Sequence, residues 1–374
     1  MTKNDDKCVP ALRFKGFNND WAQRMLGEIS IVNSGKDYKQ LNKGNIPVYG
    51  TGGYMLSVDQ YLSKNDAVGI GRKGTIDHPQ YLKAPFWTVD TLFFMTVREN
   101  NNLHYLYSLF QKINWKKYDE STGLPSLSKK TINNISVKVP EYIEQKRIGN
   151  FISQVDSLLS LQQRKLQQLK LLKKAMLQDL FADKAVPKLR FRGFKDYWVP
   201  KKLGDIANFI NGRAYKQNEL LDKGKYKVLR VGNFYTNDSW YFSNLELKPQ
   251  YYINKGDLVY TWSATFGPHI WRGEKVIYHY HIWKINLSKS LNKKFVFYLL
   301  KADKAKLLSN TNGSTMIHIT KRNMESKTVL IPNTIEQSQI RNSLDNVSNL
   351  ITFQQEKIAE VKQIKQFLLQ NMFI

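Results

Sequence analysis

Two stretches of this chain nearly repeat each other: residues 9–17 read VPALRFKGF and residues 186–194 read VPKLRFRGF. Seven of the nine positions are identical, at an offset of 177 residues. A second set of identities recurs at an offset of 192: Glu144-Gln145 with Glu336-Gln337, Gln162-Gln163 with Gln354-Gln355, and Phe181 with Phe373. A period this long indicates a duplicated domain rather than a solenoid. The chain therefore holds two copies of one module, and its function is expected to need two related sites at a fixed separation.

The composition limits what these sites bind. The formal net charge is +26, the pI is about 9.8 and 42% of the residues are hydrophobic, as in a folded protein with a strongly positive field. We therefore expect a polyanionic partner. Cys8 is the only cysteine, which excludes a disulfide framework and indicates a reducing compartment. No apolar run approaches the ~20 residues of a membrane span, so we expect a cytoplasmic protein with no membrane partner.

The positive charge is unevenly distributed. The net charge is +7 for residues 9–140, +3 for 141–182, +16 for 186–332 and 0 for 333–374. The two larger segments are therefore expected to bind the anion. The two short, nearly balanced segments are expected to pack on each other or on protein.

The short segments are predicted to be long helices, each with one apolar seam that advances in steps of four and three residues. The first seam comprises Ile148, Ile152, Val155, Leu159, Gln162, Leu166, Leu169, Lys173, Met176 and Leu180. The second comprises Ile340, Leu344, Val347, Ile351, Gln354, Ile358, Val361, Lys365, Leu368 and Met372.

The polar interruptions of the seams coincide, since Gln162 and Lys173 correspond to Gln354 and Lys365. Polar residues at seam positions lower stability but fix register and partner choice. We infer that the two helices pair, in antiparallel fashion because this relates two copies by an approximate two-fold axis. The alternative is that each helix packs separately on its own head. Thirty-eight helical residues would extend about 57 Å at 1.5 Å per residue, which is long enough to act as a ruler.

The larger segments are predicted to be α+β heads that share a frame. Leu26-Gly27-Glu28-Ile29 corresponds to Leu203-Gly204-Asp205-Ile206, and apolar alternation at 92–97, 227–231 and 277–285 predicts strands. The middles differ, because 20 residues separate Gln40 from Tyr61 whereas 34 separate Gln217 from Tyr252. Different middles on one frame indicate two different ligands of one chemical kind, such as two DNA sequences.

The order head, helix, head, helix is accompanied by two closing patterns, Leu127-Ser-Lys129, Pro140, Ile143-Glu-Gln145, Ile148 and Ile319-Thr-Lys321, Pro332, Ile335-Glu-Gln337, Ile340. In this order and these patterns the chain resembles the specificity subunits of type I restriction-modification enzymes. The resemblance implies two α+β target recognition domains and two long helices that pair as an antiparallel coiled coil. The implied boundaries are recognition domains at 9–140 and 186–332 and spacer helices at 141–182 and 333–374.

The resemblance also implies partners. Each head would read one half of a bipartite, asymmetric site in double-stranded DNA, and the helices would set the unread spacer and dock two modification subunits. Two restriction subunits would complete the complex. The adenine methyltransferase and ATP-dependent endonuclease activities, with S-adenosylmethionine, ATP and Mg, would belong to these partners, so the chain itself is expected to be non-catalytic and without a cofactor.

The residues agree with the absence of chemistry. The chain contains neither the Asn/Asp-Pro-Pro-aromatic motif of adenine methyltransferases nor a phosphate loop ending in Gly-Lys-Ser/Thr. Residues 69–74 match G-x-G-x-x-G, but no helix is predicted after them, so a basic loop is favoured over a dinucleotide site. His269, His279 and His281 lack a Cys or carboxylate that would complete a zinc set, so no metal is expected. His279 and His281 are interpreted as a structural or DNA-facing pair on one strand.

Candidate DNA-binding residues are those that offer donors to phosphates or base edges. In the first head they are Lys36, Tyr38, Lys39, Arg72, Lys73, Lys129 and Lys130, and in the second Arg213, Tyr215, Lys216, Arg230, Asn233, Lys321 and Arg322. About half are expected to touch DNA and the rest to be solvated surface charges. Tyr38 and Tyr215 are equally consistent with core packing, and Trp21 and Trp198 are predicted to be core residues.

A second function stays open on composition alone. A non-specific DNA- or RNA-binding scaffold would also use the positive charge and an aromatic content of 13%.

Overall fold

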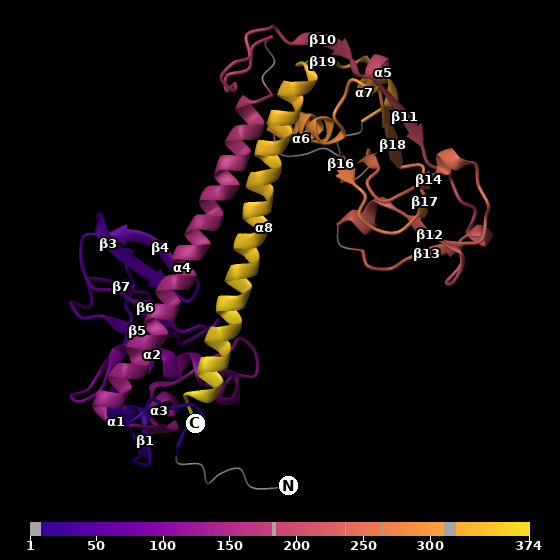
Figure 1. Ribbon diagram of the computed structural model, residues 1–374. Helices are drawn as coiled ribbons and strands as arrows, with labels where there is room; N and C mark the ends of the chain where they lie inside the picture. The colour runs from indigo at the N-terminus through magenta and orange to yellow at the C-terminus, as the bar shows by residue number, and fades with distance from the viewer. Residues whose placement is uncertain (1–8, 182–184, 236, 264, 310–318) are drawn as a thin grey trace. The chain divides into compact units, whose positions relative to one another are not determined.

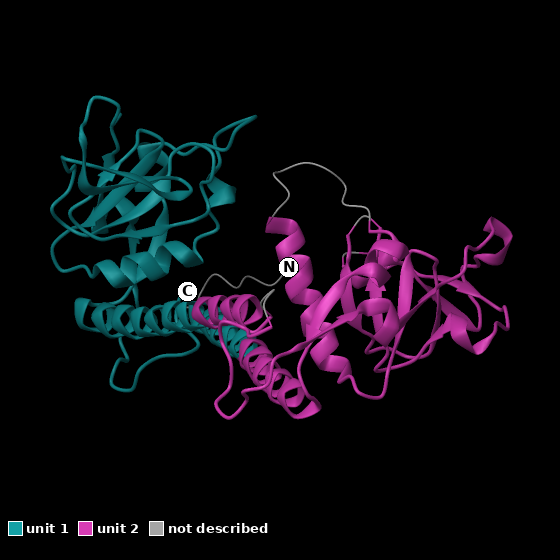
Figure 2. Ribbon diagram, turned by 90° about the horizontal axis from the view of Figure 1, so that it is seen from above, with its two compact units in different colours: residues 1–165, 354–374 teal, residues 166–353 magenta. Residues whose placement is uncertain are grey.

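The structure is a computed structural model that describes residues 9–181, 185–235, 237–263, 265–309 and 319–374. It divides into two compact units, residues 1–165 with 354–374 and residues 166–353, which are coloured separately in Figure 2. Each unit therefore combines a head with portions of both long helices. Cys8 and residue 182, the last of the predicted first spacer, lie outside the described residues.

The first head is a mixture of short strands and helices (Figure 1). Its elements are β1 Ala22–Met25, α1 Leu26–Ile29, β2 Ser30–Ser34, β3 Lys43–Gly50, β4 Gly53–Val58, β5 Ala67–Gly71, β6 Gln80–Leu82, β7 Trp87–Thr88, β8 Leu92–Val97, α2 Leu103–Lys112, the 3-10 turn Trp115–Tyr118, α3 Lys129–Asn133 and β9 Ser136–Val139. The strands form sheets in the orders β2-β8-β5-β6, β4-β3-β7 and β1-β9. The predicted strand 92–97 coincides with β8.

The second head repeats this order. Its elements are β10 Val199–Lys202, α5 Leu203–Ile206, β11 Ala207–Asn211, the 3-10 turn Gln217–Glu219, β12 Tyr226–Leu229, the 3-10 turn Val231–Phe234, β13 Tyr241–Ser243, the 3-10 turn Pro249–Tyr251, β14 Tyr252–Ile253, β15 Leu258–Thr261, β16 Gly267–Ile270, β17 Val276–Tyr278, β18 Ile282–Leu287, α6 Lys293–Ser309, α7 Lys321–Ser326 and β19 Thr328–Ile331. The sheets are β11-β18-β15-β16, β13-β12-β17-β14 and β10-β19.

The two heads share the first sheet and differ in the second. Sheets β2-β8-β5-β6 and β11-β18-β15-β16 correspond strand for strand, and α1 and α5 are the repeated Leu-Gly-acid-Ile segments. The second sheet has three strands in one head and four in the other, and the longer middle of the second head supplies the additional turns. The predicted α+β class is confirmed.

The predicted strand at 277–285 is wrong as a single element. It is two strands, β17 and β18, separated by a turn at Tyr280 and His281. β17 pairs with β12 and β14, whereas β18 pairs with β11 and β15, so the chain passes from one sheet to the other here. His279 and His281 therefore do not alternate on one strand. The prediction failed because apolar alternation in a sequence does not reveal where the chain changes from one sheet to another.

The long helices are α4, Tyr142–Asp179, and α8, Thr334–Asn371, each of 38 residues as predicted (magenta and yellow in Figure 1). In the first unit they run antiparallel, because Asp156 pairs with Lys365 while Gln162, farther along α4, contacts Gln354, farther back along α8. Every residue of the two seams is buried or half-buried, so these residues lie on the covered faces of the helices.

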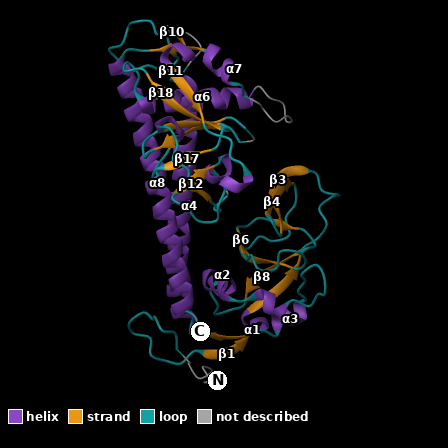
Figure 3. Cartoon of the chain, turned by 90° about the vertical axis from the view of Figure 1, so that its right-hand side faces the viewer, coloured by secondary structure: helices purple, strands orange, loops and turns teal. Residues whose placement is uncertain are grey.

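The alternative packing on the heads also holds at the start of each helix. Ile148 and Ile152 belong to the core of the first head, and Ile340 and Leu344 belong to that of the second. In the first unit α2 lies between the sheet and α4 (Figure 3). The seam therefore serves the heads at one end of each helix and the partner helix farther along.

The repeated nonapeptide ties each head to its own helix. Arg13 donates to both carboxylate oxygens of Glu144 at 2.7 and 2.8 Å, and Arg190 does the same to Glu336 at 2.8 and 2.9 Å. Both glutamates are 1% exposed. A paired, doubly hydrogen-bonded carboxylate can be buried at acceptable cost, which explains why the Arg and the Glu recur together.

The first head is closed by the end of the helix that belongs to the other repeat. Leu12 donates its backbone N–H to the backbone oxygen of Asn371 over 2.8 Å. The ring of Phe373 lies 5.3 Å from Tyr105 and 6.4 Å from Trp21. Trp21 is buried, as predicted.

The second head is closed in the same way by the end of α4. Leu189 donates its backbone N–H to the backbone oxygen of Asp179 over 3.0 Å. The ring of Phe181, the counterpart of Phe373, lies 5.5 Å from Phe295, and Phe295 in turn contacts the buried Trp198. Each unit is thus built from segments of both repeats.

Candidate nucleic-acid interface

A repeated glycine places the first basic cluster of each head. A Cβ at Gly35 would lie 1.9 Å from the backbone oxygen of Val89, and one at Gly212 would lie 2.4 Å from that of His279, so only glycine fits at either position. The next residue in each copy donates its backbone N–H across this approach: Lys36 to Thr88 at 2.9 Å and Arg213 to Tyr278 at 3.0 Å. The glycine therefore holds the basic cluster at the same edge of both heads.

In the first head this cluster leaves its cations in solvent. Lys36 and Lys39 are exposed, whereas the ring of Tyr38 packs half-buried against a core cluster of the same head. Tyr38 and Lys39 line a groove of about 660 Å³ beside the β3–β4 hairpin, whose Tyr54 and Met55 are exposed. The groove combines cations with apolar surface.

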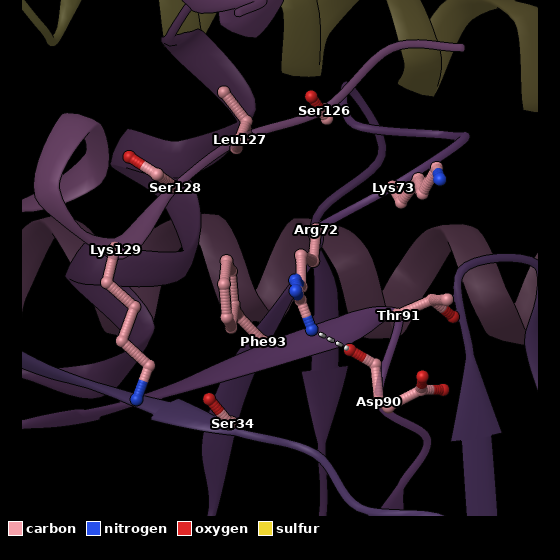
Figure 4. Close-up of a pocket in the computed structure, with 10 residues that line it drawn as sticks. All are labelled: Ser34, Arg72, Lys73, Asp90, Thr91, Phe93, Ser126, Leu127, Ser128 and Lys129. Carbon is pink, nitrogen blue, oxygen red and sulfur yellow. Dashed lines mark hydrogen bonds between the residues drawn. The ribbon is translucent and has the colours of Figure 1, made fainter. Parts of the chain in front are cut away.

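A cavity of about 690 Å³ brings together three other predicted residues, Arg72, Lys73 and Lys129 (Figure 4). Residues 72 and 73 leave β5 as a loop and not as a helix, in agreement with the sequence prediction for the G-x-G-x-x-G segment. Leu127 donates its backbone N–H to the oxygen of Arg72 over 2.9 Å, which joins the two segments that supply the cations. Lys130 is exposed and does not line the cavity.

The cavity is electrostatically positive. Asp90 is the only carboxylate among its lining residues, and within the described part of the chain none of its three cations has an ion-pair partner. Arg72 donates to the backbone oxygen of Asp90 over 3.4 Å and lies over the ring of Phe93, and Lys129 extends toward Ser34 in Figure 4. These side chains can therefore meet an anion without first breaking a salt bridge.

In the second head Arg213 is already engaged. Its guanidinium donates to both oxygens of Glu219, at 2.9 and 2.6 Å, and lies 5.2 Å from the centre of the Tyr215 ring. The Glu219 hydrogen bond is the largest cause that raises the pKa of Arg213. Tyr215 packs against a core cluster, and Lys216 is exposed. Of this group, only Lys216 presents a charge that is not engaged in an ion pair among the described residues.

Arg230 and Asn233 organise a turn. The Asn233 amide donates to the backbone oxygens of Asn237 and Ser239 at 3.0 and 2.9 Å, and its oxygen accepts from the backbone N–H of Arg230. The Arg230 guanidinium lies 4.2 Å from the centre of the Tyr241 ring. The sequence alone does not show that the polar groups of Arg230 and Asn233 form hydrogen bonds within their own turn.

The last predicted pair lies at the start of α7, as Lys129 and Lys130 lie at the start of α3. Ser128 and Thr320 cap the two helices, each accepting a hydrogen bond from a backbone N–H. Lys321 contacts Glu325 at 3.5 Å, and Arg322 is exposed. The frame therefore repeats the position of the basic pair in both heads.

Burial suppresses the charge of two histidines in the second head. Burial first, and then the nearby His281 and Arg230, lower the pKa of His279 to about 4. Burial, Lys304 and Lys301 lower that of His269 to about 4. Among the described residues no three His, Cys, Asp or Glu side chains are grouped so as to hold a metal ion, and none of the described helices is long and apolar enough to cross a membrane.

Sequence analysis missed a second group of cations. Arg272, Lys294, Lys301 and Lys304 line a cleft of about 710 Å³ in the second unit. Lys301 and Lys304 are three residues apart on α6 and so share a helix face, a spacing that was visible in the sequence. The contribution of Arg272, from a loop, was not.

Comparisons with known proteins agree with this architecture. The sequence profile of the family described as "Type I restriction modification DNA specificity domain" matches residues 18–171 and 195–363. The type I restriction enzyme MjaVIII specificity subunit of Methanocaldococcus jannaschii is 25% identical over 289 residues, which cover 71% of this chain and 68% of that protein. The EcoBI specificity subunit of Escherichia coli is 24% identical over 172 residues, 45% of this chain and 36% of that protein.

Solved structures share the fold. The S subunit of a type I restriction-modification system from M. genitalium has a TM-score of 0.64 at 13% identity, with 98% of this chain and 99% of that chain covered. A chain from a structure of type I R-M complex assembly has a TM-score of 0.59 at 15% identity, with 94% and 97% covered. Since the family profile matches most of both repeats, the chain belongs to the type I restriction-modification specificity family and carries two copies of its DNA specificity domain.

Proposed function

We propose that this chain is the DNA-reading subunit of a type I restriction-modification complex, and that each head reads one half of a split, asymmetric DNA target. The observation that carries the proposal is a repeated frame with diverged reading surfaces. The first sheets correspond strand for strand, whereas the second sheet of the second head has an additional strand, β14, and a longer middle. A common frame would place both heads alike against DNA, and different surfaces would read different bases.

In the first head we assign the initial contacts to the cavity formed by Arg72, Lys73 and Lys129 and to the exposed Lys36, Lys39 and Lys130. Lysine and arginine bind phosphates by releasing counterions, and arginine also reads guanine edges in the major groove. In this proposal Tyr38 supports the groove and Lys39 binds the backbone.

In the second head we assign contacts to Lys216, Lys321 and Arg322. Arg213, Tyr215, Arg230 and Asn233 then act mainly as positioning residues, since their polar groups bond Glu219, Tyr278, Ser239 and Asn237. Arg230 retains donors beyond its bond to Ser239 and remains a candidate for a base contact.

The paired helices would set the length of the unread spacer and dock two modification subunits, with two restriction subunits completing the complex. We place S-adenosylmethionine, ATP and Mg on those partners, where the methyl transfer and DNA cleavage would occur. We place the assembled protein in the cytoplasm with its DNA. The alternative of a non-specific DNA- or RNA-binding scaffold lacks support from the family match, and it gives no reason for two diverged heads on one frame.

Exchange of residues 10–140 for the corresponding head of a relative tests the proposal. After coexpression with the cognate modification subunit, mapping of methylated adenines should show one changed half-site, one unchanged half-site and the same spacer. The matched control exchanges residues 186–332 and should change only the other half. A change in both halves, or in neither, would contradict the assignment of one half-site to each head.

A further inference from the structure

Each unit contains a cleft between the helix of its head and the start of its own long helix. The first cleft, of about 930 Å³, is lined by His104, Tyr107 and Ser108 on α2 and by Ser153, Asp156 and Ser157 on α4, together with Tyr81 on β6. The second, of about 710 Å³, is lined by Lys294, Phe297 and Tyr298 on α6 and by Asp345, Ser348 and Asn349 on α8, together with His269 on β16.

These residues occupy the same places in the two repeats. Asn102 and Asn292 each cap the helix of their own head. The backbone N–H of Asn102 donates to the side-chain oxygen of Gln145 at 3.0 Å, and that of Asn292 donates to the side-chain oxygen of Gln337 at 2.9 Å. Counted from these caps, the three cleft residues of α2 correspond in order to those of α6: His104 to Lys294, Tyr107 to Phe297 and Ser108 to Tyr298. At the offset of 192, the cleft residues of α4 correspond to those of α8: Ser153 to Asp345, Asp156 to Ser348 and Ser157 to Asn349. The clefts are therefore two versions of one feature.

The first cleft carries one net positive charge, that of Arg164, because its lysine and its aspartate pair with each other. Asp156 forms an ion pair with Lys365, which lines the same cleft, and Tyr81 stacks on His104 with ring centres 5.0 Å apart. At the position that corresponds to Lys301, the first repeat has Gln111. This cleft offers hydrogen bonds and ring surfaces but little net charge.

The second cleft has an excess of positive charge. Its one lining carboxylate, Asp345, is already bonded to Lys294 and to the Tyr298 hydroxyl, both at 2.8 Å. Within the described ranges, Lys301, Lys304 and Arg272 have no carboxylate partner. Burial is the largest cause that lowers the pKa of Lys301 to about 8, and repulsion by Lys173, Lys304 and Arg272 adds to it.

The two repeats place the carboxylate of the cleft at different positions. Lys173 is the counterpart of Lys365, but the position of Asp156 is Ser348 in the second repeat, and the carboxylate is instead that of Asp345, which is bonded to Lys294 and Tyr298. Lys173 lies 5.9 Å from the centre of the Tyr298 ring, beside the cleft. Lys301, Lys304 and Arg272 thus line one cavity without matching carboxylates, and such clusters are destabilising unless an anion binds.

We propose that the second cleft is a phosphate-binding site that the first repeat lacks, with the phosphate held by Lys301, Lys304 and Arg272. A single carboxylate would match one cation, whereas the several oxygens of a phosphate can accept from all three side chains. The phosphate comes either from the DNA backbone, which would give the second head an additional grip on DNA, or from a free phosphate compound. The site does not depend on which bases the heads read.

The test uses the full-length chain and the variant Lys301→Gln, which installs the residue of the first repeat. Binding of inorganic phosphate is followed by phosphorus-31 NMR at constant ionic strength. Binding of duplex DNA is followed by fluorescence anisotropy between about 50 and 200 mM salt, because DNA affinity changes steeply with the number of phosphate contacts over this range. Loss of a DNA phosphate contact should reduce the slope of log K against log salt by about 0.9 and weaken binding several-fold. The matched control is Lys289→Gln, which removes an exposed lysine just before α6.

Ser348→Asp is a second variant, which replaces the Ser348 hydroxyl, a hydrogen-bond partner of Tyr298, with a carboxylate that lines the cleft. If Lys301→Gln and Ser348→Asp weaken the binding of DNA alone, the DNA backbone is the source of the phosphate. If they weaken the binding of inorganic phosphate, the source is a free phosphate compound. The proposed phosphate site is wrong if both variants match Lys289→Gln in both assays. It is also wrong if poly-glutamate, used as a third ligand, is the only one whose binding depends on Lys301. Half-site preference, measured in parallel by methylation mapping, reports separately on the proposed function.

Discussion

Gln354 donates a hydrogen bond from its side-chain Nε2 to the backbone oxygen of Gln162 over 3.0 Å. The two residues hold the same place in the two repeats, so equivalent positions of the two helices meet at this contact. Gln354 is 3% exposed, and a buried amide is stable only while its partner is present. The contact therefore fixes the register of the helix pair as well as its direction.

This register makes a specific prediction about the spacer. Removal of residues 163–169 together with residues 347–353 deletes one heptad from each helix and keeps Gln162 opposite Gln354. Seven residues rise about 10 Å, the length of about three base pairs, so methylation mapping should show a spacer shorter by about that amount and unchanged half-sites. A deletion from α4 alone should instead break the register and abolish methylation. An unchanged spacer in the double deletion would refute the role of the helices as a ruler.

The repeated Arg–Glu pair predicts a large loss of stability on truncation. Arg13→Ala leaves the Glu144 carboxylate buried without its partner, and breaking a buried ion pair from one side costs about 3–5 kcal/mol. The loss should appear as a lower urea midpoint for unfolding of the first unit. Lys15→Ala, which truncates an exposed lysine of the same nonapeptide, should change the midpoint little. Equal midpoints for the two variants would show that the pair contributes no net stability.

Arg72 is predicted to contribute to recognition by the first head. Arg72→Ala should weaken DNA binding by about 1–3 kcal/mol if the guanidinium reads a base, and the loss should be greatest for duplexes with the correct first half-site. Competition anisotropy with duplexes altered in one half-site measures this preference. The control is Arg24→Ala, because Arg24 is exposed on β1 and away from the cavity. A uniform loss across all duplexes would reassign Arg72 to a phosphate.

The second unit is predicted to lose stability in mild acid. His269 and His279 have pKa values of about 4 in the folded chain, against about 6.5 when unfolded, so between these pH values the unfolded state binds more protons. Stability should therefore fall as the pH decreases from about 7 toward 4. Thermal unfolding at pH 7 and pH 5 measures the fall, and His269→Gln should reduce it. A melting temperature independent of pH would contradict the burial of these rings.

Much of the frame was predictable because repetition and periodicity are recorded directly in the sequence. The seams, the two helix lengths and the core role of Trp21 and Trp198 all follow from spacing or from recurrence. The short strands at 277–285 were less tractable, since apolar alternation is the same on either side of a change of sheet. The exchange of helix ends, in which Phe373 closes the first head and Phe181 the second, left only an identity at an offset of 192.

The binding residues were predictable by type but not by role. Arg72, Lys73 and Lys129 are distant in sequence, yet the structure gathers them in one cavity. Arg213 looked equivalent to them, but Glu219 lies six residues away and captures its guanidinium. The sequence shows the spacing of Glu219 from Arg213 and of Lys304 from Lys301, but it does not show which of these side chains meet a partner in space.

The closure of each head by the other repeat has an evolutionary consequence. Phe181 and Phe373 each complete a hydrophobic core whose strands belong to the other repeat. A single ancestral repeat would have exposed an unfilled core and an unattached helix end, so it would have required a second copy in order to fold. Gene fusion would then have converted an obligate pair of identical chains into one chain whose halves were free to diverge.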